Sequence, residues 1–195
     1  MNKPPPFPVS GAVLAGGRSS RMGRDKAFLL LDGVPLVARQ TALLGSLGLE
    51  DLLISGRAGI DYAVPTARVV TDPVADAGPL AGLAAVLAAV RHPWVLVVAV
   101  DVPRLTATFL QRILDTGAGR IGVAPHAPHG FEPLVALYPR ALLPRIEAAL
   151  AERRLGLQAL LADATRDGLM IRMDLSDADL PLLANWNAPE DLHAP

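Results

Sequence analysis

Four cationic side chains are interleaved with three glycines in the segment that follows the first apolar run of the chain. The run covers Val9–Leu14, and the segment after it contains Gly16, Gly17, Arg18, Arg21, Gly23, Arg24 and Lys26. Glycine lets the backbone approach a ligand closely, and successive backbone N–H groups in such a loop form an anion site. Because Asp25 is the one anion among these cations, the segment predicts a polyphosphate ligand. The alternative is a surface loop with solvated charges.

The spacing of the glycines excludes two common nucleotide-binding motifs. A P-loop has four residues between its first glycine and a Gly-Lys-Ser/Thr run, whereas five residues separate Gly17 from Gly23 and Arg24 follows. The dinucleotide fingerprint has one residue between its first two glycines, but Gly16 and Gly17 are adjacent. The loop therefore represents another kind of phosphate site.

The segment from Leu14 to Lys26 resembles the signature loop of nucleotidyltransferases with a Rossmann-like fold, Leu-Ala-Gly-Gly-x-Ser-x-Arg-Met-Gly-x-Asp-Lys. More narrowly, it is similar to the loop of molybdenum cofactor guanylyltransferases, which join GMP from GTP to molybdopterin and release pyrophosphate. The resemblance implies that the loop wraps the triphosphate, with Leu14, Ala15 and Gly16 beside the nucleotide and Lys26 on its phosphates. Nucleotidyl transfer depends chiefly on positioning and on neutralising oxygens, which suits these cations.

A carboxylate follows the most apolar strand-like run of the chain. Residues 94–100 read Trp-Val-Leu-Val-Val-Ala-Val, and Asp101 and Pro103 come directly after them. Mg²⁺ takes one or two carboxylates together with phosphate oxygens, so Asp101 is the predicted metal ligand. The alternative is a helix cap or a turn residue. In the similar family the residue before this aspartate is commonly Cys, and here it is Val100.

Two further positions bear on the nucleotide base. Asp72 follows an expected strand at 68–71, and the resemblance implies that it accepts hydrogen bonds from guanine N1–H and N2–H₂. Its alternative role is an N-cap or an Asx turn. Ser55 stands where the guanylyltransferases often have Asn, so a specific contact there is the weaker prediction.

Segments that resemble the acceptor side of the family are shorter. Residues 78–82 read Gly-Pro-Leu-Ala-Gly, where Gly78 and Gly82 either approach the acceptor or serve helix packing. Residues 185–191 read Asn-Trp-Asn-Ala-Pro-Glu-Asp, where Asn185 can reach the site and Asn187 is also an ordinary N-cap. Residues 131–138 resemble a stretch near molybdopterin, whereas His126 and His129 are interpreted as solvated turn residues.

Strand-sized apolar runs alternate with helix-like segments, and this order predicts a three-layer α/β/α Rossmann-like domain with a mostly parallel sheet. We expect strands at residues 9–14, 51–54, 68–71, 94–100 and 120–124, with shorter ones at 28–31, 132–137 and 168–173. We expect helices at residues 35–47, 79–90, 106–115, 139–152 and 156–161, with Pro35, Pro79 and Pro139 in first turns. Since ligands bind beyond the carboxyl ends of parallel strands, the glycine loop, Asp72 and Asp101 should meet at one edge.

Composition narrows the class of protein. The chain has 195 residues, of which 51% are hydrophobic and 19% charged, with no cysteine and a net charge of −1. These values predict one domain at residues 9–195 after a flexible tail at 1–8, and they exclude disulfides and Cys-based metal sites. No apolar run reaches the roughly 18 residues of a membrane span, and the charge offers no attraction to nucleic acid or anionic membranes. A cytoplasmic monomer is expected.

The resemblance extends from about Gly11 to Leu192 and implies one reaction. GTP and molybdopterin would give molybdopterin guanine dinucleotide and pyrophosphate, with Mg²⁺ on Asp101, with Arg21 and Lys26 at the leaving group, and with amides around Gly16 and Gly17 holding the nucleotide. Proteins that insert molybdenum or deliver the cofactor are implied as partners. Two alternatives stay open: a relative that uses CTP with molybdopterin or an alditol phosphate, and a catalytically silent nucleotide-binding adaptor.

Overall fold

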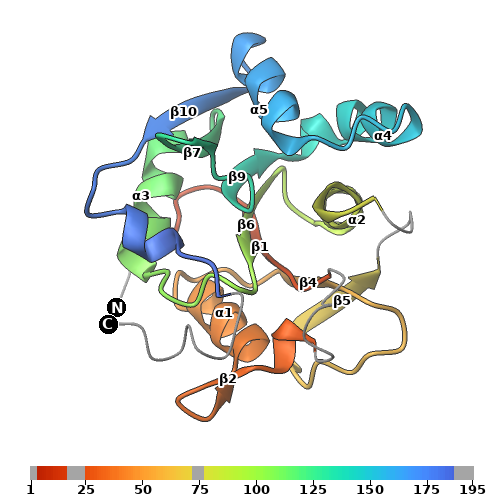
Figure 1. Ribbon diagram of the computed structural model, residues 1–195, viewed down its shortest axis with the longest axis vertical. Helices are drawn as coiled ribbons and strands as arrows, with labels where there is room; N and C mark the ends of the chain where they lie inside the picture. Colours follow the sequence, from red (N-terminus) through yellow and green to blue (C-terminus); the bar gives the residue numbers. More distant parts are fainter. Residues whose placement is uncertain (1–3, 17–24, 72–76, 187–195) are drawn as a thin grey trace.

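The computed structural model describes residues 4–16, 25–71 and 77–186, and these residues form a sheet covered by helices on both faces (Figure 1). The described strands of the main sheet number eight, in the order β10-β7-β9-β6-β1-β4-β5 with β8 paired to β7. They are β1 (Val9–Leu14), β4 (Leu52–Gly56), β5 (Ala67–Thr71), β6 (Trp94–Ala99), β7 (Gly122–Ala127), β8 (Gly130–Phe131), β9 (Val135–Pro139) and β10 (Met170–Asp174). A separate hairpin joins β2 (Leu30–Leu31) to β3 (Val34–Pro35).

The helices divide into two layers. The α-helices are α1 (Leu36–Gly45), α2 (Pro79–Ala89), α3 (Ala107–Gly117), α4 (Leu143–Ala151) and α5 (Leu157–Arg166), and the short 3₁₀ turns are η1 (Lys26–Phe28), η2 (Arg140–Leu142) and η3 (Leu180–Leu183). Helices α1 and α3 pack in one apolar cluster, and α2, α4 and α5 pack in the other. Successive side chains of the central strand β1 point into opposite clusters, since Val13 belongs to the first and Ala12 to the second. The predicted three-layer α/β/α class is confirmed.

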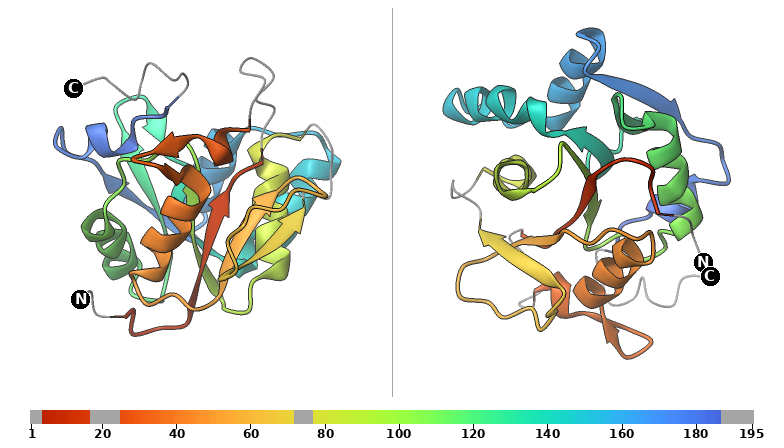
Figure 2. Two further views of the ribbon diagram at one scale, coloured as in Figure 1. Left: turned by 90° about the horizontal axis from the view of Figure 1, so that it is seen from below. Right: turned by 180° about the vertical axis from the view of Figure 1, so that it is seen from behind.

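The direction of the strands brings the predicted site residues to one edge of the sheet. Strand β1 is parallel to β4 and β6, and β4 is parallel to β5, so their carboxyl ends lie together. The register pairs Leu14 with both Ala99 and Ser55, which sets the base of the glycine loop beside the residues that precede Asp101. Strand β9 runs antiparallel between β6 and β7, which makes the sheet mixed. Figure 2 (left) shows η1 in orange and η3 in blue at this same end.

Most expected elements are present, and the bounds of several of them differ from the expectation. The strand expected at 28–31 begins only at Leu30, because Lys26–Phe28 forms the turn η1 with Asp25 as its N-cap. The helix expected at 139–152 begins at Leu143, because Pro139 ends β9, where it pairs with Trp94. Pro144, not Pro139, therefore stands in the first turn of that helix. Pro35 likewise ends β3 as the residue before α1, and the turn predicted at Asp32-Gly33 is confirmed by positive φ angles of 52° and 78°.

The residues just before β1 pack on the body of the protein. Phe7 contacts Gly119 after α3 and packs against the core cluster, and Pro4 contacts Gly48 after α1. This part of the expected tail is thus in contact with the domain rather than loose. No described helix combines the length and the apolarity that crossing a bilayer requires.

Candidate active site

The base of the glycine loop is held between two strands. Backbone N–H groups of Ala15 and Gly16 both donate to the carbonyl of Ser55, at 2.8 and 3.0 Å, and Val100 N–H donates to the carbonyl of Leu14. Leu14 and Ala15 are buried, and Ser55 has no exposed surface. The carbonyl of Ser55 therefore holds the start of the loop against β4. The N–H groups of Ala15 and Gly16 are both used in these hydrogen bonds within the protein.

Lys26 and Asp101 meet at the carboxyl edge of the sheet. Lys26 Nζ lies 2.7 Å from Asp101 Oδ2, and each side chain keeps 22% of its surface exposed. The two residues come from the far end of the glycine loop and from the end of β6, which are distant in sequence. This ion pair confirms that the sheet brings together two of the predicted functional side chains. Its exposure leaves both charges accessible to an anionic ligand.

Two hydrogen bonds fix the backbone around Asp101. The buried Gln40 side chain of α1 donates from Nε2 to the carbonyl of Val102 at 2.6 Å. Trp186 N–H donates to the carbonyl of Asp101 itself at 2.8 Å, and the Trp186 ring is buried. The segment after β6 is thus held from α1 and from the C-terminal part of the chain. Its carboxylate is positioned in advance of any ligand.

A second ion pair stands directly before Lys26. Asp25 caps η1 by accepting a hydrogen bond from Ala27 N–H at 3.1 Å, and its other oxygen lies 2.6 Å from Arg57 Nη2. The hydrogen bond and charge of Asp25 raise the pKa of Arg57. Arg57 N–H in turn donates to the Tyr62 hydroxyl, and burial raises the pKa of that phenol. This network links η1, and so Lys26, to the end of β4.

Aromatic packing supports the same network. The Phe28 ring stacks on Tyr62 with centroids 5.6 Å apart and planes 3° from parallel. A Cβ at Gly56 would lie 2.4 Å from the Tyr62 ring, so glycine is required where β4 passes beneath it. Sequence reasoning identified neither Arg57 nor Tyr62, because both act through folded contacts with a loop that is distant in sequence.

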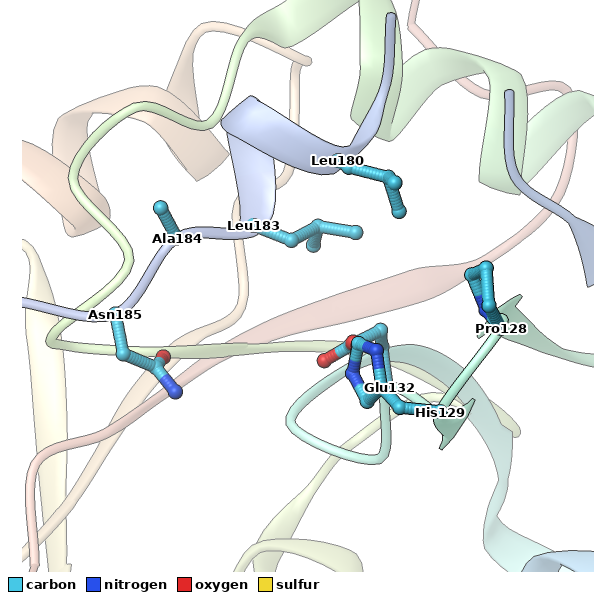
Figure 3. Close-up of a pocket in the computed structure, with 7 residues that line it drawn as sticks. All are labelled: Pro128, His129, Glu132, Leu180, Leu183, Ala184 and Asn185. Carbon is cyan, nitrogen blue, oxygen red and sulfur yellow. The ribbon is translucent and has the colours of Figure 1, made fainter. Parts of the chain in front are cut away.

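A cleft of about 570 Å³ opens beyond the carboxyl end of β7 (Figure 3). It is lined by Pro128, His129, Glu132, Leu180, Leu183, Ala184 and Asn185. His129 is exposed in the turn between β7 and β8, as expected for a solvated turn residue, and its Nε2 lies 2.8 Å from Glu132 Oε1. His126 belongs to β7, where its ring packs edge-to-face on Phe131 at 4.9 Å. The correction at His126 arises because β7 extends to Ala127, three residues further than expected.

The remaining predicted residues fall into two groups. Gly78 precedes α2 with φ of 62°, a conformation that side-chain-bearing residues rarely adopt, and Gly82 is buried within α2. Asn185 is exposed and lines the cleft. The other predicted residues lie outside the described residues: Gly17, Arg21, Asp72 and Asn187. Their roles stay predictions.

Comparison with known proteins gives the family. A family model described as a MobA-like NTP transferase domain matches residues 11–168, which include the loop base, Lys26 and Asp101. The chain belongs to this family. A MobA-like relative from Opitutus terrae, named a probable molybdenum cofactor guanylyltransferase, is 41% identical over 94% of this chain and 92% of its own. The molybdenum cofactor guanylyltransferase of Pseudomonas aeruginosa is 38% identical over the same shares.

Solved structures agree on the MobA-like fold. Molybdopterin-guanine dinucleotide biosynthesis protein A from Archaeoglobus fulgidus superposes with a TM-score of 0.72 at 22% identity, covering 94% of each chain. The 2-C-methyl-D-erythritol 4-phosphate cytidylyltransferase of Thermus thermophilus superposes with a TM-score of 0.70 at 18% identity, covering 95% of this chain and 96% of its own. These likenesses confirm the nucleotidyltransferase fold.

Proposed function

We propose that this chain transfers GMP from GTP to the terminal phosphate of molybdopterin, producing molybdopterin guanine dinucleotide and pyrophosphate. The Lys26–Asp101 pair at the carboxyl edge of the sheet carries the proposal, because it sets a cation and a carboxylate beside the glycine loop. The names of relatives at 38–41% identity support the choice of nucleotide and acceptor.

The proposed reaction is an in-line displacement at the α-phosphorus of GTP. An oxygen of the acceptor phosphate forms the new P–O bond, and the bond from the α-phosphorus to the oxygen bridging to the β-phosphate breaks. The electron pair of that bond leaves with pyrophosphate. A phosphate monoester is already largely ionised near pH 7, so the attacking oxygen needs no strong general base. The protein therefore has to hold and neutralise oxygens.

Lys26 has the central neutralising role among the described residues. In the free protein its ammonium group contacts Asp101, and a bound triphosphate offers it a second anionic partner at the same edge. Asp25 and Arg57 hold the turn from which Lys26 projects. Arg21, predicted from the same loop, would share the negative charge of the leaving pyrophosphate, since a guanidinium fork matches phosphate geometry.

Asp101 fits the predicted Mg²⁺. The described residues contain no cluster of three or more His, Cys, Asp or Glu side chains that could enclose a metal. Mg²⁺ commonly takes one or two carboxylates together with substrate phosphates and water, and the half-buried Asp101 carboxylate suits that arrangement. When bound there, Mg²⁺ would reduce repulsion between the phosphate oxygens. A cytoplasmic location, a monomeric state and partner proteins for molybdenum insertion or delivery stay predictions.

A panel of nucleoside triphosphates with molybdopterin tests the function. We expect the guanine dinucleotide by mass, with pyrophosphate released in equal amount from GTP. Preferential formation of product from CTP would favour the cytidylyltransferase alternative. Calorimetric binding of GTP without any pyrophosphate release in the presence of molybdopterin and Mg²⁺ would favour the silent adaptor and overturn the proposal.

A further inference from the structure

Helix α1 is hydrogen-bonded to the segments on both sides of the Lys26–Asp101 pair. Its first residue, Leu36, donates from its N–H to the carbonyl of Leu29 at 2.9 Å, directly after the turn η1 that contains Lys26. One turn later, Gln40 Nε2 donates to the carbonyl of the residue after Asp101 at 2.6 Å. Figure 2 (left) shows the start of α1, in orange, beside η1 at the carboxyl end of the sheet. One turn of one helix therefore spans the two segments that supply the cation and the carboxylate.

Three successive residues after β6 are each held by a different part of the chain. Val100 N–H donates to a carbonyl of β1 at 3.1 Å, and the Asp101 carbonyl accepts from Trp186 N–H at 2.8 Å. The Val102 carbonyl accepts from the Gln40 side chain. The first two bonds join backbone to backbone, so they do not depend on the identity of a side chain. The third requires a side chain that can donate, and it is therefore the anchor that a substitution can remove.

We propose that Gln40 is a positioning residue for the nucleotidyl transfer, and that its amide sets the direction in which the Asp101 carboxylate points. The inference rests on the proposed function, because that function assigns Asp101 to the phosphates. Groups that do chemistry have to be held within about 0.5 Å of their productive position by residues that are themselves locked in place. Gln40 acts in this way through the backbone one residue beyond Asp101, rather than on a substrate.

Burial fixes the Gln40 amide and makes its bond hard to replace. Gln40 is 1% exposed, and Val102 and Leu105 of the loop are buried in the core cluster. The Val102 carbonyl also accepts from Leu105 N–H, but at 3.5 Å, which is the longer and weaker bond. Because a buried carbonyl without a good donor is costly, loss of the Gln40 amide would turn this carbonyl toward another donor or toward water. A turn of the loop there would also change the direction of the Asp101 carboxylate.

The Gln40 bond matters most when the nucleotide is bound. In the free protein the Asp101 carboxylate is also held by Lys26 Nζ at 2.7 Å. In the proposed function the triphosphate offers Lys26 a second anionic partner, so the hold of Lys26 on Asp101 weakens as the phosphates bind. The backbone anchors then have the larger share in placing the carboxylate. Since a misplacement of about 1 Å can lower a rate about 10²-fold, loss of one anchor should appear in kcat rather than in the binding of GTP.

Two neighbouring side chains of α1 provide a matched pair of substitutions. Gln40→Met keeps an unbranched side chain of similar length but removes the donor. Thr41→Val removes a donor that is equally buried, at 1% exposed, and that bonds to the carbonyl of Val37 within the helix at 2.8 Å. Both variants lose one buried hydrogen bond of the same helix, but Gln40→Met alone loses a bond to the Asp101 loop. A difference in kcat between them therefore measures positioning rather than stability.

Steady-state kinetics with GTP and molybdopterin test the role. Gln40→Met should lower kcat about tenfold while the KM for GTP stays within about twofold of the wild type, whereas Thr41→Val should leave both values unchanged. If Gln40→Met does not fold, Gln40→Asn, which withdraws the amide by one methylene, should give the same loss of kcat. A kcat in the Gln40 variant equal to that of Thr41→Val would overturn the positioning role.

Hydrogen exchange in the protein without metal or nucleotide separates failure of this role from failure of the proposed function. The N–H groups of residues 101–105 should exchange about tenfold faster in Gln40→Met than in Thr41→Val, relative to the amides of β6, as the loss of one hydrogen bond allows. Faster exchange combined with no transfer even in the wild type would sustain the anchoring of the loop by Gln40 and reject the function. Unchanged exchange and unchanged kcat in Gln40→Met, with an active wild type, would reject the positioning role and leave the function intact.

Discussion

Two aspartates at opposite ends of the sheet show how the same side chain can serve structure or chemistry. Asp51 precedes β4 and has only 4% of its side chain exposed, whereas Asp101 follows β6 with 22% exposed. Asp51 accepts hydrogen bonds from Ser10 Oγ at 2.6 Å, Arg91 N–H at 3.0 Å and Arg68 Nη2 at 2.7 Å. Asp101 instead contacts Lys26, whose side chain is equally accessible.

The two aspartates differ in whether their partners can exchange the carboxylate for another anion. Ser10 belongs to β1, Arg68 belongs to β5, and Arg91 lies in the loop before β6, so Asp51 ties together the amino ends of neighbouring strands. Burial alone would raise the pKa of Asp51, but the hydrogen bonds from Ser10, the Arg91 backbone and Arg68 together lower it below its ordinary value of 3.8. Lys26 is a flexible cation that can exchange one anion for another. A saturated carboxylate stabilises the fold, whereas an accessible one remains available to a ligand.

The largest expected effect is at the accessible carboxylate. Asp101→Asn should lower kcat at least about 10²-fold, because it removes the charge proposed to hold Mg²⁺ at the phosphates. Pyrophosphate release at saturating substrates measures the loss, and Tm should stay within about 2 °C of the wild type. Near-normal turnover of this variant in Mg²⁺ would remove the metal assignment.

At Asp51, whose carboxylate is fully hydrogen-bonded, we expect a loss of stability without a loss of activity. Asp51→Asn should lower the free energy of unfolding by about 1–3 kcal/mol, since three donors lose a charged acceptor in a buried place. Urea denaturation measures the change, and kcat of the folded variant should equal that of the wild type. Asp115→Asn on the exposed surface of α3, where Asp115 accepts from Gln111, is the matched control. Equal stabilities of the two variants would show that the Asp51 network contributes little.

Acidification should remove the difference in unfolding free energy between the wild type and Asp51→Asn. A carboxyl group whose pKa is lower in the folded state stabilises fully above its unfolded pKa, and the stabilisation is lost as the pH falls through the folded value. The difference in unfolding free energy between the two proteins should therefore be constant from pH 7 to about pH 5 and shrink below pH 3.8. A difference that grew on acidification would contradict the sign of this pKa change.

The smallest effect is expected at the support of Lys26. Arg57 is 57% exposed, so its ion pair with Asp25 contributes little to stability. Arg57→Gln should raise the KM for GTP about two- to fivefold, equivalent to about 0.5–1 kcal/mol, with kcat unchanged. Arg57→Lys, which keeps the charge, should restore part of the affinity. A loss in kcat of the size expected for Asp101→Asn would place Arg57 in the chemistry itself.

The sequence predicts the parts of this molecule that depend on local pattern. Strand β1 begins and ends where the apolar run does, and β6 delivers Asp101 at its end because a strand buried on both faces reads as a continuous apolar run. Pro79 stands in the first turn of α2 as expected. The resemblance in the glycine loop gave the family, since the spacing of its residues is highly specific.

Other features depend on contacts that local pattern does not encode. Pro139 resembles a helix start, yet its pairing with Trp94 places it at the end of β9. Ser55 is expected to follow a strand as a ligand-binding residue would, but it lies within β4 and its carbonyl accepts hydrogen bonds from the loop base. In each case a tertiary contact decides between two local alternatives.

The hydrogen bond from Trp186 to the carbonyl of Asp101 also sets the timing of assembly during translation. Almost half of the chain lies between these two residues, so Asp101 leaves the ribosome long before its backbone partner does. Strands β7, β9 and β10 and the turn η3 are all synthesised after Asp101, so the sheet beside β6 and the last wall of the cleft are completed only in the second half of synthesis. The site is therefore complete only once nearly the whole chain has been made.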